Sequence, residues 1–504
     1  MYDIINLSNV CEVIMLLSML MDKIEYTKAI NDCEIDHITN DSREARFGSI
    51  FVCVKGFNTD GHLYAPRAYE NGCRVFVCEH RPKLLPDDAT VITLESSKRA
   101  LAVLSRELYG DPSRELTVIG ITGTKGKTTT ALMIKQLIDM SGIPTGYIGS
   151  NGIQYGSHKI DSANTTPESH KLQYHMRSMI DSGIKAVVME ISSQALKYDR
   201  VLGISFDITL FTNFSPDHIG PGEHSDLEDY FLAKKKLFDE FDAHTVIANA
   251  DDAKSAAILK DCRANIKYYS ASKRADYYAQ NLTPYRSNLA IGTLFDLSYE
   301  ESSLPCDVAL PGEFNVYNAL ATVALAHTLG ISPSVSTQAL RRIQIEGRFE
   351  ILSHPSGALF VIDYAHNELS LRSALLALRE YEPARLICLF GSVGCRTQVR
   401  RAQLGKASSK YADFSILTSD NPDTEPPEQI IGDIASQFAD SDSYISIPDR
   451  ADAIRYACSI AKSGDIFLLA GKGHERYQLI NGKKVYFCER EIIEDSINEL
   501  NLIK

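Results

Sequence analysis

A chain of 504 residues has room for about three domains of ~150 residues each. Its composition, 44% hydrophobic and 23% charged, is that of an ordinary soluble globular protein, and its net charge of −13 argues against a nucleic-acid-binding surface. The eleven cysteines form no CxxC pair and no zinc-ligand spacing, which favours a reduced protein. The apolar run at residues 13–21 is too short to cross a bilayer, so we expect no membrane span and a cytoplasmic location.

Short β-type runs separated by polar turns occupy the first part of the chain. The runs lie at residues 50–54, 74–78 and 90–94, and the turn cluster Gly-Asp-Pro-Ser at 110–113 ends the region. We therefore place a boundary there and expect a small α/β N-terminal domain over residues 1–112.

The segment at residues 116–141 is the most informative part of the chain. An apolar run at 116–121 enters the loop GTKGKTT at 123–129, and a segment with helical apolar periodicity follows. In such a loop, backbone N–H groups and a helix N-terminus face a triphosphate, while Lys127 reaches the terminal phosphates and Thr128 can ligate Mg²⁺. Ile121 stands where the longer GxxxxGK[ST] loop has its first glycine, so this is a shorter variant. An accidental glycine turn would leave Lys-Thr at a helix start unexplained.

Strand and helix patterns alternate beyond this loop. Strands are predicted at residues 186–191, 207–212 and 245–249, which indicates a parallel sheet with helices on both faces. Less regular β patterns follow at 266–310, and residues 311–342 have a mostly helical pattern. We expect a central domain over residues 113–346 with a parallel sheet of the phosphate-loop type.

A second alternating series starts near residue 349. Its strands are predicted at residues 359–364, 386–390, 414–418 and 466–470. This series predicts a Rossmann-like C-terminal domain over residues 347–504. The predicted fold class is therefore α/β with three domains.

Polar clusters follow five of the predicted strands. They are Glu190 with Ser192 and Ser193, Asp217-His218, DYAH at 363–366, SDNPD at 419–423 and GKGHE at 471–475. Any one of them could be a solvated loop. Five in succession favour an active site, because functional groups in open α/β sheets gather at the carboxyl ends of the strands.

One lysine falls on the apolar face of a predicted helix at residues 226–241. At 100° per residue Lys234 lies in the middle of the apolar stripe, whereas Lys235 and Lys236 point away. A buried lysine is costly unless it is paired or chemically altered. The alternative is a lysine that extends out of the face to solvent.

Together these motifs carry a resemblance to a known family. The chain resembles the Mur ligases, most closely the MurE type, over nearly its whole length. The matching segments are Asp41-Ser42-Arg43, residues 56–62, the loop at 123–129, NTTP at 164–167, EISS at 190–193 with Arg200, Asn213 with Asp217-His218, Lys234, FNVYN at 314–318, GRFE at 347–350, DYAH and GKGHE. Folylpolyglutamate synthetases share the loop but lack the N-terminal domain and the DNP…GKGHE pair.

The resemblance implies an ATP-dependent carboxylate–amine ligase of peptidoglycan synthesis. Such an enzyme adds an amino acid to UDP-N-acetylmuramoyl-L-Ala-D-Glu through an acyl phosphate. Its ligands would be ATP, Mg²⁺, the UDP-muramoyl dipeptide and a free amino acid, with no nucleic acid. The sequence has no feature that sets the oligomeric state, and a monomer is the working expectation.

Motif positions imply a role for each matched residue. The implied catalytic residues are Lys127, Glu190, His218 and Lys234, and the implied metal ligands are Thr128, Glu190, His218 and a carbamylated Lys234. ATP would contact Gly123, Thr124, Lys125, Gly126, Lys127, Thr128, Thr129, Asn315, Asn318, Arg348, Asp363 and His366. The UDP substrate would contact Ser42, Phe57, Asn58, Thr59, Asn164, Thr165, Thr166, Ser192 and Arg200, and the amino acid Arg396, Asp420, Asn421, Pro422, Asp423, Gly471 and Glu475.

Three departures from the family pattern concern the substrates. Gln194 replaces a histidine, the loop from His218 to Lys234 is about two residues longer than usual, and Asp423 stands where diaminopimelate enzymes have arginine. A carboxylate there favours L-lysine or L-ornithine over meso-diaminopimelate. The alternative is that Asp423 faces solvent while Arg400 or Arg401 binds a distal carboxylate.

Two other functions compete with this one. The first is a related ATP-dependent amide ligase outside peptidoglycan synthesis, similar to folylpolyglutamate synthetase. The second is a non-catalytic nucleotide-binding relative. The presence of Lys127, Glu190, His218 and Lys234 counts against the second.

Overall fold

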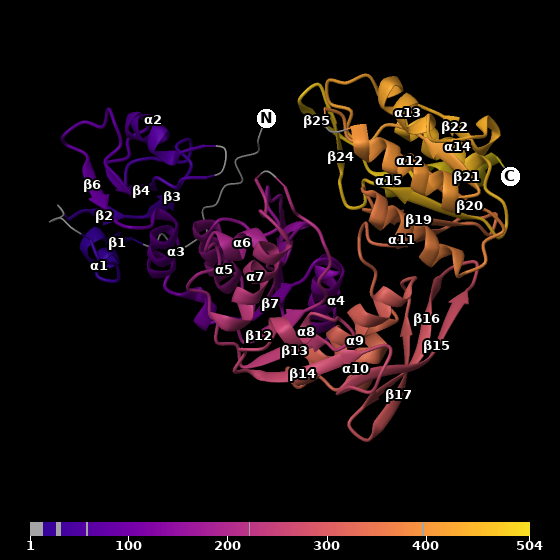
Figure 1. The fold of residues 1–504 in the computed structure, drawn as a ribbon, viewed down its shortest axis with the longest axis horizontal. Coiled ribbons are helices and arrows are strands. Elements are labelled where there is room, and N and C mark those ends of the chain that lie inside the picture. Colours follow the sequence, from indigo (N-terminus) through magenta and orange to yellow (C-terminus); the bar gives the residue numbers. More distant parts are fainter. Residues whose placement is uncertain (1–13, 27–31, 57–58, 221, 396–397, 504) are drawn as a thin grey trace. The chain divides into compact units, whose positions relative to one another are not determined.

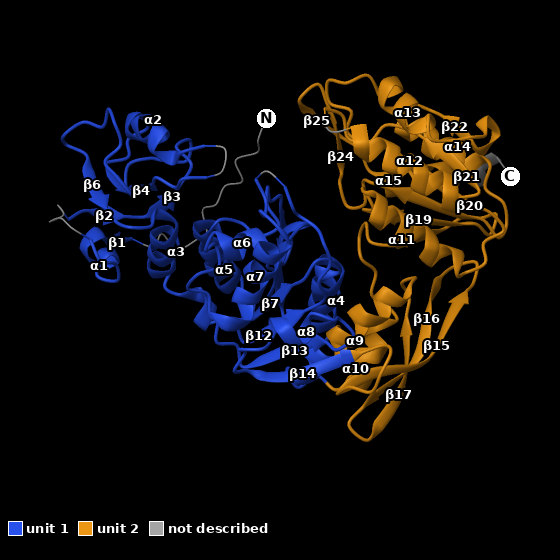
Figure 2. Ribbon diagram, in the orientation of Figure 1, with its two compact units in different colours: residues 1–269, 324–331 blue, residues 270–323, 332–504 orange. Residues whose placement is uncertain are grey.

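The computed structural model describes residues 14–26, 32–56, 59–220, 222–395 and 398–503. The chain divides into two compact units, shown in Figure 2. Unit 1 comprises residues 1–269 and 324–331, and unit 2 comprises residues 270–323 and 332–504.

Unit 1 begins with a four-stranded parallel sheet in the order β3-β4-β5-β6 (Figure 1). The elements of this region are β1 (Met15–Leu16), α1 (Leu17–Met21), β2 (Glu34–Ile35), β3 (His37–Thr39), β4 (Ser49–Val52), the 3₁₀ helix η1 (Gly61–Tyr64), α2 (Ala65–Glu70), β5 (Val75–Cys78), β6 (Thr90–Thr93) and α3 (Ser97–Leu108). Alternation along β4 places Ile50 and Val52 in one core with α3, and Phe51 in a second core with α2. The three predicted strands are confirmed.

The phosphate loop belongs to the larger sheet of unit 1. Within this unit the strand order is β10-β9-β8-β11-β7-β12-β13-β14. The strands are β7 (Thr117–Thr122), β8 (Thr145–Gly149), β9 (Gly152–Tyr155), β10 (His158–Ile160), β11 (Ala186–Glu190), β12 (Ile208–Phe211), β13 (Thr245–Asn249) and β14 (Asn265–Ser270). The helices are η2 (Pro112–Arg114), α4 (Lys127–Met140), α5 (Ser169–Asp181), α6 (Ser193–Lys197), α7 (Leu227–Asp239) and α8 (Ser255–Ile258).

The pairing within this sheet positions the candidate site. β7 lies between β11 and β12 and is parallel to both, so the loop that follows β7 emerges beside the carboxyl ends of two neighbours. The short strands β9 and β10 are antiparallel and form one edge. The predicted parallel sheet is confirmed.

Unit 2 contains an antiparallel meander and a second α/β sheet. The meander consists of β15 (Tyr277–Arg286), β16 (Ile291–Tyr299) and β17 (Ser302–Val308), and α9 (Glu313–Thr328) and α10 (Pro333–Leu340) follow it along the chain. The predicted helical stretch at 311–342 is thus two helices, the second of which begins with Pro333 after the N-cap Ser332.

The second sheet has the order β18-β19-β23-β20-β21-β22, with β18 antiparallel and the other strands parallel. The strands are β18 (Glu350–Ser353), β19 (Leu359–Asp363), β20 (Leu386–Phe390), β21 (Phe414–Leu417), β22 (Tyr444–Ser446), β23 (Ile466–Ala470) and the hairpin β24 (Tyr477–Ile480) and β25 (Lys483–Tyr486). The helices are α11 (Glu368–Arg379), α12 (Gln398–Tyr411), α13 (Pro427–Ala435), η3 (Ser441–Ser443), α14 (Arg450–Ser459) and α15 (Glu489–Ile503). All four predicted strands of this region are confirmed.

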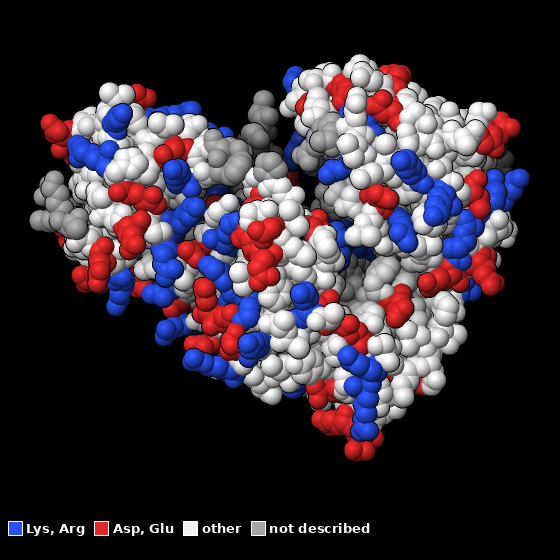
Figure 3. Space-filling model, viewed as in Figure 1, with Lys and Arg blue, Asp and Glu red and all other residues white. Residues whose placement is uncertain are grey.

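The structure confirms the predicted α/β fold class. Acidic and basic side chains are interspersed over the face drawn in Figure 3. Among the described helices, none combines the length and the apolar character that a membrane crossing requires.

Candidate active site

The loop GTKGKTT joins the carboxyl end of β7 to the first residue of α4, as the sequence predicts. Two glycines are required by its geometry. Gly126 has φ = 83° immediately before the helix, and Gly123 has φ = 147° with no room for a Cβ beside Thr212. The backbone N–H groups at the start of α4 therefore lie at the end of a buried strand, which is where a phosphate group binds.

Two lysines converge on one carbonyl oxygen in this loop. The Nζ atoms of Lys127 and Lys234 each donate to the carbonyl oxygen of Gly123 at 2.8 Å. Lys234 comes from α7 and is only 1% exposed, so the predicted placement on the buried face is confirmed. The alternative of a lysine reaching solvent is wrong.

The surroundings of Lys234 disfavour its positive charge. Its Nζ lies 4.6 Å from the centre of the Tyr230 ring, and no carboxylate within ion-pair distance is described. Burial lowers the pKa of Lys234 well below its usual value, and the nearby Lys127 lowers it further. Lys235, by contrast, pairs with Asp239 and Asp261 at 2.7 Å. Of these two lysines, Lys234 is therefore the one whose surroundings favour a neutral amine.

Glu190, the last residue of β11, is the centre of a hydroxyl and carboxylate cluster. It is fully buried and accepts hydrogen bonds from the hydroxyls of Thr128 (2.8 Å) and Tyr147 (2.5 Å) and from the N–H of Ser150 (2.9 Å). A threonine hydroxyl beside a carboxylate is a set of hard oxygen donors, which fits Mg²⁺. No group of three His, Cys, Asp or Glu side chains suited to a metal ion occurs among the described residues, so other oxygens would have to complete the coordination.

His218 lies outside this cluster in the structure. Its side chain is 49% exposed, its Nδ1 is 3.1 Å from Glu223, and its ring centre is 6.0 Å from that of Tyr230. The neighbouring Asp217 pairs with Lys125 at 2.9 Å. The Tyr230 ring therefore contacts both His218 and Lys234, while no described contact joins those two residues.

The longer loop before α7 is attached to α6 through a buried histidine. His224 lies 2.9 Å from the Ser193 hydroxyl through Nε2 and 3.2 Å from Asp229 through Nδ1, and Gln194 donates to the carbonyl oxygen of Gly222. Gln194, one departure from the family pattern, therefore contacts the lengthened loop, which is another.

The predicted UDP-substrate residues of the central region gather beside Glu190. The Thr166 hydroxyl donates to the carbonyl oxygen of Glu190 and accepts from the N–H of Ser192, and Arg200 donates to the carbonyl oxygen of Thr166. The hydroxyl of Thr165 is 3.0 Å from that of Ser150, and Asn164 precedes it in the same loop.

The predicted UDP-substrate residues of the N-terminal region lie in loops. Ser42 is buried, and its carbonyl oxygen accepts from the Asn71 side chain. Thr59 holds the turn at Gly56 through its carbonyl oxygen. Phe57 and Asn58 lie outside the described residues.

The remaining ATP candidates belong to unit 2. Asn318 donates to Asn315, the Arg348 guanidinium lies 4.7 Å over the Tyr364 ring, and His366 is 2.9 Å from the carbonyl oxygen of Tyr364. Asp363 accepts from the N–H groups of Phe349 and Ala365. Burial raises the pKa of Asp363 to about 6, although Arg348 and the backbone N–H groups oppose the shift.

The amino-acid candidates of unit 2 surround a buried lysine that the sequence analysis left unassigned. Lys472 is 0% exposed and donates to Asn421 and Glu475 at 2.8 Å, with Asp420 at 3.6 Å. Gly471 has φ = 112°, and a Cβ there would be 3.0 Å from the Asp420 carboxylate. Pro422 packs against Gly394, where a Cβ would not fit. The structure thus brings Asp420, Asn421, Gly471 and Glu475 together.

The sequence predicts three further residues near the amino acid, and the structure places two of them. Asp423 accepts a hydrogen bond from the N–H of Gly482 at 2.7 Å, so its carboxylate faces the turn of the β24–β25 hairpin. Arg401 is 1% exposed and already pairs with Glu425 and Asp433. Arg396 lies outside the described residues.

Sequence reasoning missed the residues that hold the candidates in place. Tyr147 contacts Glu190 and Tyr230 contacts Lys234, but neither tyrosine belongs to a recognisable motif. Lys472 had a signal, because it lies within GKGHE between two assigned residues. A lysine that lies between two predicted pocket residues of one motif can be predicted to belong to the same pocket.

A glycine loop on a central parallel strand, beside a hydroxyl–carboxylate cluster and two lysines, defines the site of an enzyme that uses ATP. Three family models match successive parts of the chain: "Mur ligase family, catalytic domain" at residues 34–109, "Mur ligase middle domain" at 121–326 and "Mur ligase, glutamate ligase domain" at 347–473. The chain belongs to the Mur ligase family. It is an ATP-dependent ligase that forms amide bonds.

Two curated relatives span almost the whole chain. The UDP-N-acetylmuramoyl-L-alanyl-D-glutamate--2,6-diaminopimelate ligase of Clostridium botulinum is 38% identical over 493 residues, covering 96% of this chain and 100% of the relative. The ligase of the same name from Bacillus velezensis is 38% identical over 479 residues, covering 94% and 96%.

Solved structures agree with this assignment. A UDP-N-acetylmuramoyl-L-alanyl-D-glutamate--2,6-diaminopimelate ligase has a TM-score of 0.68 at 29% identity, covering 93% of this chain and 95% of that one. A Mycobacterium tuberculosis folylpolyglutamate synthase has a TM-score of 0.58 at 16% identity over 73% of this chain and 91% of that one, which shows a shared fold alone.

Proposed function

We propose that the enzyme joins 2,6-diaminopimelate to UDP-N-acetylmuramoyl-L-alanyl-D-glutamate with ATP and Mg²⁺ in peptidoglycan synthesis. The observation that carries the proposal is a grouping of three features at the carboxyl ends of β7 and β11. They are the phosphate loop, the buried Glu190–Thr128 pair and the buried Lys234, for which no carboxylate within ion-pair distance is described. Relatives named for this reaction match over 94% or more of the chain, which supports the choice of substrates.

The amino acid in this proposal differs from the one that the sequence favoured. The sequence favours L-lysine or L-ornithine because Asp423 would repel a distal carboxylate. In the structure the Asp423 carboxylate accepts a hydrogen bond from the N–H of Gly482. A carboxylate turned toward the hairpin is a weaker argument against diaminopimelate, and the relatives named for diaminopimelate support that amino acid. Arg401 is buried and its two terminal nitrogens already pair with Glu425 and Asp433, so it is a poor candidate for binding the distal carboxylate.

The reaction proceeds in two balanced steps. The substrate carboxylate takes the γ-phosphoryl group of ATP, which gives an acyl phosphate and ADP. The amine then attacks the acyl carbon, phosphate leaves, and the nitrogen loses a proton as the amide forms. Catalysis of such transfers rests on positioning and charge neutralisation.

The chain supplies these effects from named side chains. Lys127 and the N–H groups at the start of α4 hold the terminal phosphates, and Thr166, Ser192 and Arg200 hold the carboxylate end of the UDP substrate. Mg²⁺ on Thr128 and Glu190 would neutralise the transferred group. Asn315, Asn318, Arg348, Asp363 and His366 are proposed as further ATP contacts, and Asp420, Asn421, Gly471 and Glu475 as amino acid contacts.

Lys234 is proposed to act as its carbamate, with His218 as a second ligand of a metal ion. The neutral amine adds to the carbon of CO₂ and releases a proton, which leaves a carbamate. A side chain that as an ammonium cannot ligate Mg²⁺ thereby becomes an anionic oxygen donor. The neutral amine that this reaction needs is favoured by burial.

We also propose that the three functions follow the chain in three domains. Residues 1–112 would bind the UDP group, residues 113–346 would bind ATP, and residues 347–504 would bind the amino acid. The three matched family models, at 34–109, 121–326 and 347–473, support these boundaries.

Phosphate release tests the proposal. Purified protein is incubated with ATP, Mg²⁺ and UDP-N-acetylmuramoyl-L-Ala-D-Glu, with diaminopimelate, L-lysine or L-ornithine as the third substrate. We expect release that requires all components and is fastest with diaminopimelate, and none with Lys127→Ala. Release with a folate acceptor in place of the UDP substrate would overturn the assignment.

A further inference from the structure

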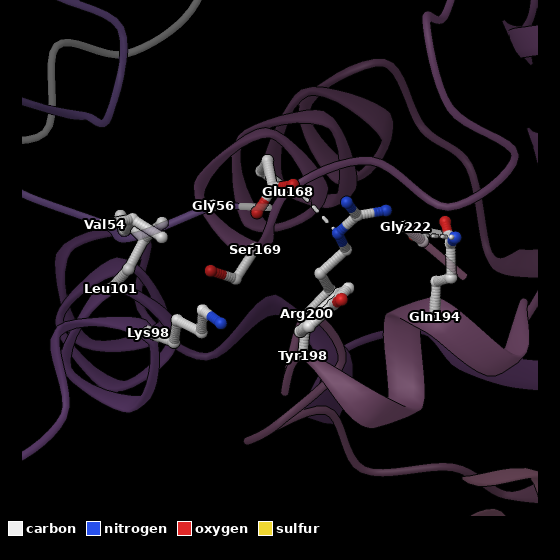
Figure 4. A pocket seen from close by; sticks show the side chains of 10 residues that line it. All are labelled: Val54, Gly56, Lys98, Leu101, Glu168, Ser169, Gln194, Tyr198, Arg200 and Gly222. Carbon is white, nitrogen blue, oxygen red and sulfur yellow. Dashed lines mark hydrogen bonds and ion pairs between the residues drawn. The ribbon is translucent and has the colours of Figure 1, made fainter. Parts of the chain in front are cut away.

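A cavity of about 180 Å³ in unit 1 lies between the N-terminal sheet region and the start of α5 (Figure 4). Its wall includes Lys98 and Leu101 of α3, Glu168 and Ser169 at the start of α5, and Tyr198 and Arg200 after α6. Arg200 is one of the proposed UDP-substrate residues, so the cavity adjoins the proposed substrate site.

The charges around the cavity are mostly positive. Glu168 pairs with Arg200 at 2.8 Å and does not cap α5, although it occupies the N-cap position. The ammonium of Lys98 and the positive ends of the α3 and α5 dipoles also contribute to the electrostatic potential in the cavity. One carboxylate thus faces two cations and two helix N-termini.

Lys98 occupies a position that folding alone disfavours. It is the second residue of α3, where a cation is repelled by the helix dipole, and the first turn of this helix contains no acidic residue. Its described contact is with an aromatic ring, since the Nζ lies 4.4 Å from the centre of the Tyr198 ring, and no carboxylate within ion-pair distance is described for it. Figure 4 shows the ammonium on the side of the cavity that faces Tyr198 and Arg200.

We propose that Lys98 binds an anionic group of the UDP-muramoyl dipeptide, with Tyr198 holding the ammonium in place. This inference rests on the proposed function, because it identifies an additional residue for the same substrate. The anionic oxygens of the substrate come from its diphosphate or its carboxylates. Because no described carboxylate lies within ion-pair distance of Lys98, a charge-assisted hydrogen bond to either would give it a counter-ion.

Direct binding measurements test Lys98. Calorimetry with UDP-N-acetylmuramoyl-L-Ala-D-Glu should show about 10- to 100-fold weaker binding to Lys98→Ala than to wild type, and Lys98→Arg should recover most of the loss. The KM for ATP should stay unchanged. Arg99→Ala is the matched control, because Arg99 lies in the same helical turn but pairs with Asp199 at 3.9 Å.

A second pair of ligands identifies the bound group. If Lys98→Ala lowers the affinity for UDP-N-acetylglucosamine by the same factor, Lys98 binds the diphosphate. If Lys98→Ala weakens the binding of the dipeptide substrate alone, Lys98 binds a carboxylate of that substrate. Tyr198→Phe should keep the affinity and Tyr198→Leu should lower it, because the ring rather than the hydroxyl contacts the ammonium.

The outcomes separate the two claims. Unchanged affinity of Lys98→Ala for a substrate that wild type binds would overturn the role of Lys98 and leave the proposed function standing. No binding to wild type would overturn both. Loss of folding is checked by thermal unfolding, in which Lys98→Ala should be as stable as wild type or more so, because it removes a cation from a helix N-terminus.

Discussion

Two lysines, one in each unit, are buried to the same degree and have opposite surroundings. Lys234 in unit 1 is 1% exposed, and its described neighbours are a backbone carbonyl, an aromatic ring and the ammonium of Lys127. Lys472 in unit 2 is 0% exposed and has Asn421, Glu475 and Asp420 around it. The contrast shows that burial alone does not decide what a lysine does.

The presence or absence of a counter-ion decides the role of a buried lysine. A buried ammonium without a carboxylate loses its proton easily and becomes a nucleophile that CO₂ can modify. A buried lysine between carboxylates forms ion pairs with them and holds them in place. Two buried carboxylates differ in the same way. Burial raises the pKa of Glu475, but Lys472, Asn421 and His474 together more than offset this, so the pKa of Glu475 is lowered. The pKa of Asp363 rises to about 6, because burial outweighs Arg348 and the backbone N–H groups.

The largest expected effect is the loss of Lys234. Lys234→Ala should lower kcat by roughly 10³-fold or more, because it removes a proposed oxygen ligand of the metal ion. Added bicarbonate should not restore activity, but a small carboxylic acid such as formate should restore part of it. Steady-state phosphate release measures both.

Lys235→Ala is the matched control for that experiment. Lys235 forms ion pairs with Asp239 and Asp261, and such partly exposed pairs contribute about 0.2–1 kcal/mol. We expect kcat within about threefold of wild type, which corresponds to less than ~0.7 kcal/mol in the barrier. Equal losses at positions 234 and 235 would contradict the carbamate.

Removal of Lys472 should damage stability and amino acid binding together. Lys472→Met leaves Asp420 and Glu475 buried without their cation, which costs about 3–5 kcal/mol in the free energy of unfolding. The KM for the amino acid should rise while the KM for the UDP substrate stays the same. Denaturant unfolding and steady-state kinetics provide the two measurements.

Lys484→Met is the control for Lys472. Both ammonium groups lie over the Tyr477 ring, at 4.2 Å for Lys484 and 5.2 Å for Lys472, but Lys484 is exposed. The control should change neither stability nor the KM for the amino acid. If both variants behave alike, the aromatic contact rather than the carboxylates explains Lys472.

The raised pKa of Asp363 predicts that the free energy of unfolding falls as the pH rises. Its pKa is raised from 3.8 to about 6, so between these pH values the folded protein retains a proton that the unfolded chain has released. The stability from this group is therefore present at low pH and lost as the pH rises through about 6, by about 3 kcal/mol at most. Asp363→Asn should match wild type near pH 4 and exceed its unfolding midpoint at pH 7. A constant difference between the two proteins would exclude a raised pKa.

The smallest expected effect is at Asp423. Asp423→Asn keeps an acceptor for the N–H of Gly482, so the ratio of kcat/KM for diaminopimelate to that for L-lysine should change less than about threefold, or ~0.7 kcal/mol. Competition assays with both amino acids measure the ratio. A tenfold rise toward diaminopimelate would show that this carboxylate faces the amino acid after all.

The sequence by itself determined the α/β architecture and the location of the phosphate loop. Buried strands such as residues 186–190 and 466–470 read as apolar runs, and the glycines of the loop are required by backbone angles that other residues rarely adopt. Periodicity also placed Lys234 on the buried face of α7, because helical spacing is a local property. Family motifs supplied the reaction class.

Only the tertiary structure decided which charges meet. Three findings depend on elements distant in the chain. No described carboxylate pairs with Lys234, Asp420 joins the nearby Glu475 around Lys472, and the Asp423 carboxylate binds a hairpin turn 59 residues away. Spacing along a strand or helix fixes the direction of a side chain but not the group that it meets across the core. Electrostatic energies fall with distance in space, so the chemistry of these side chains is set by the packing of the sheets and not by the motif that contains them.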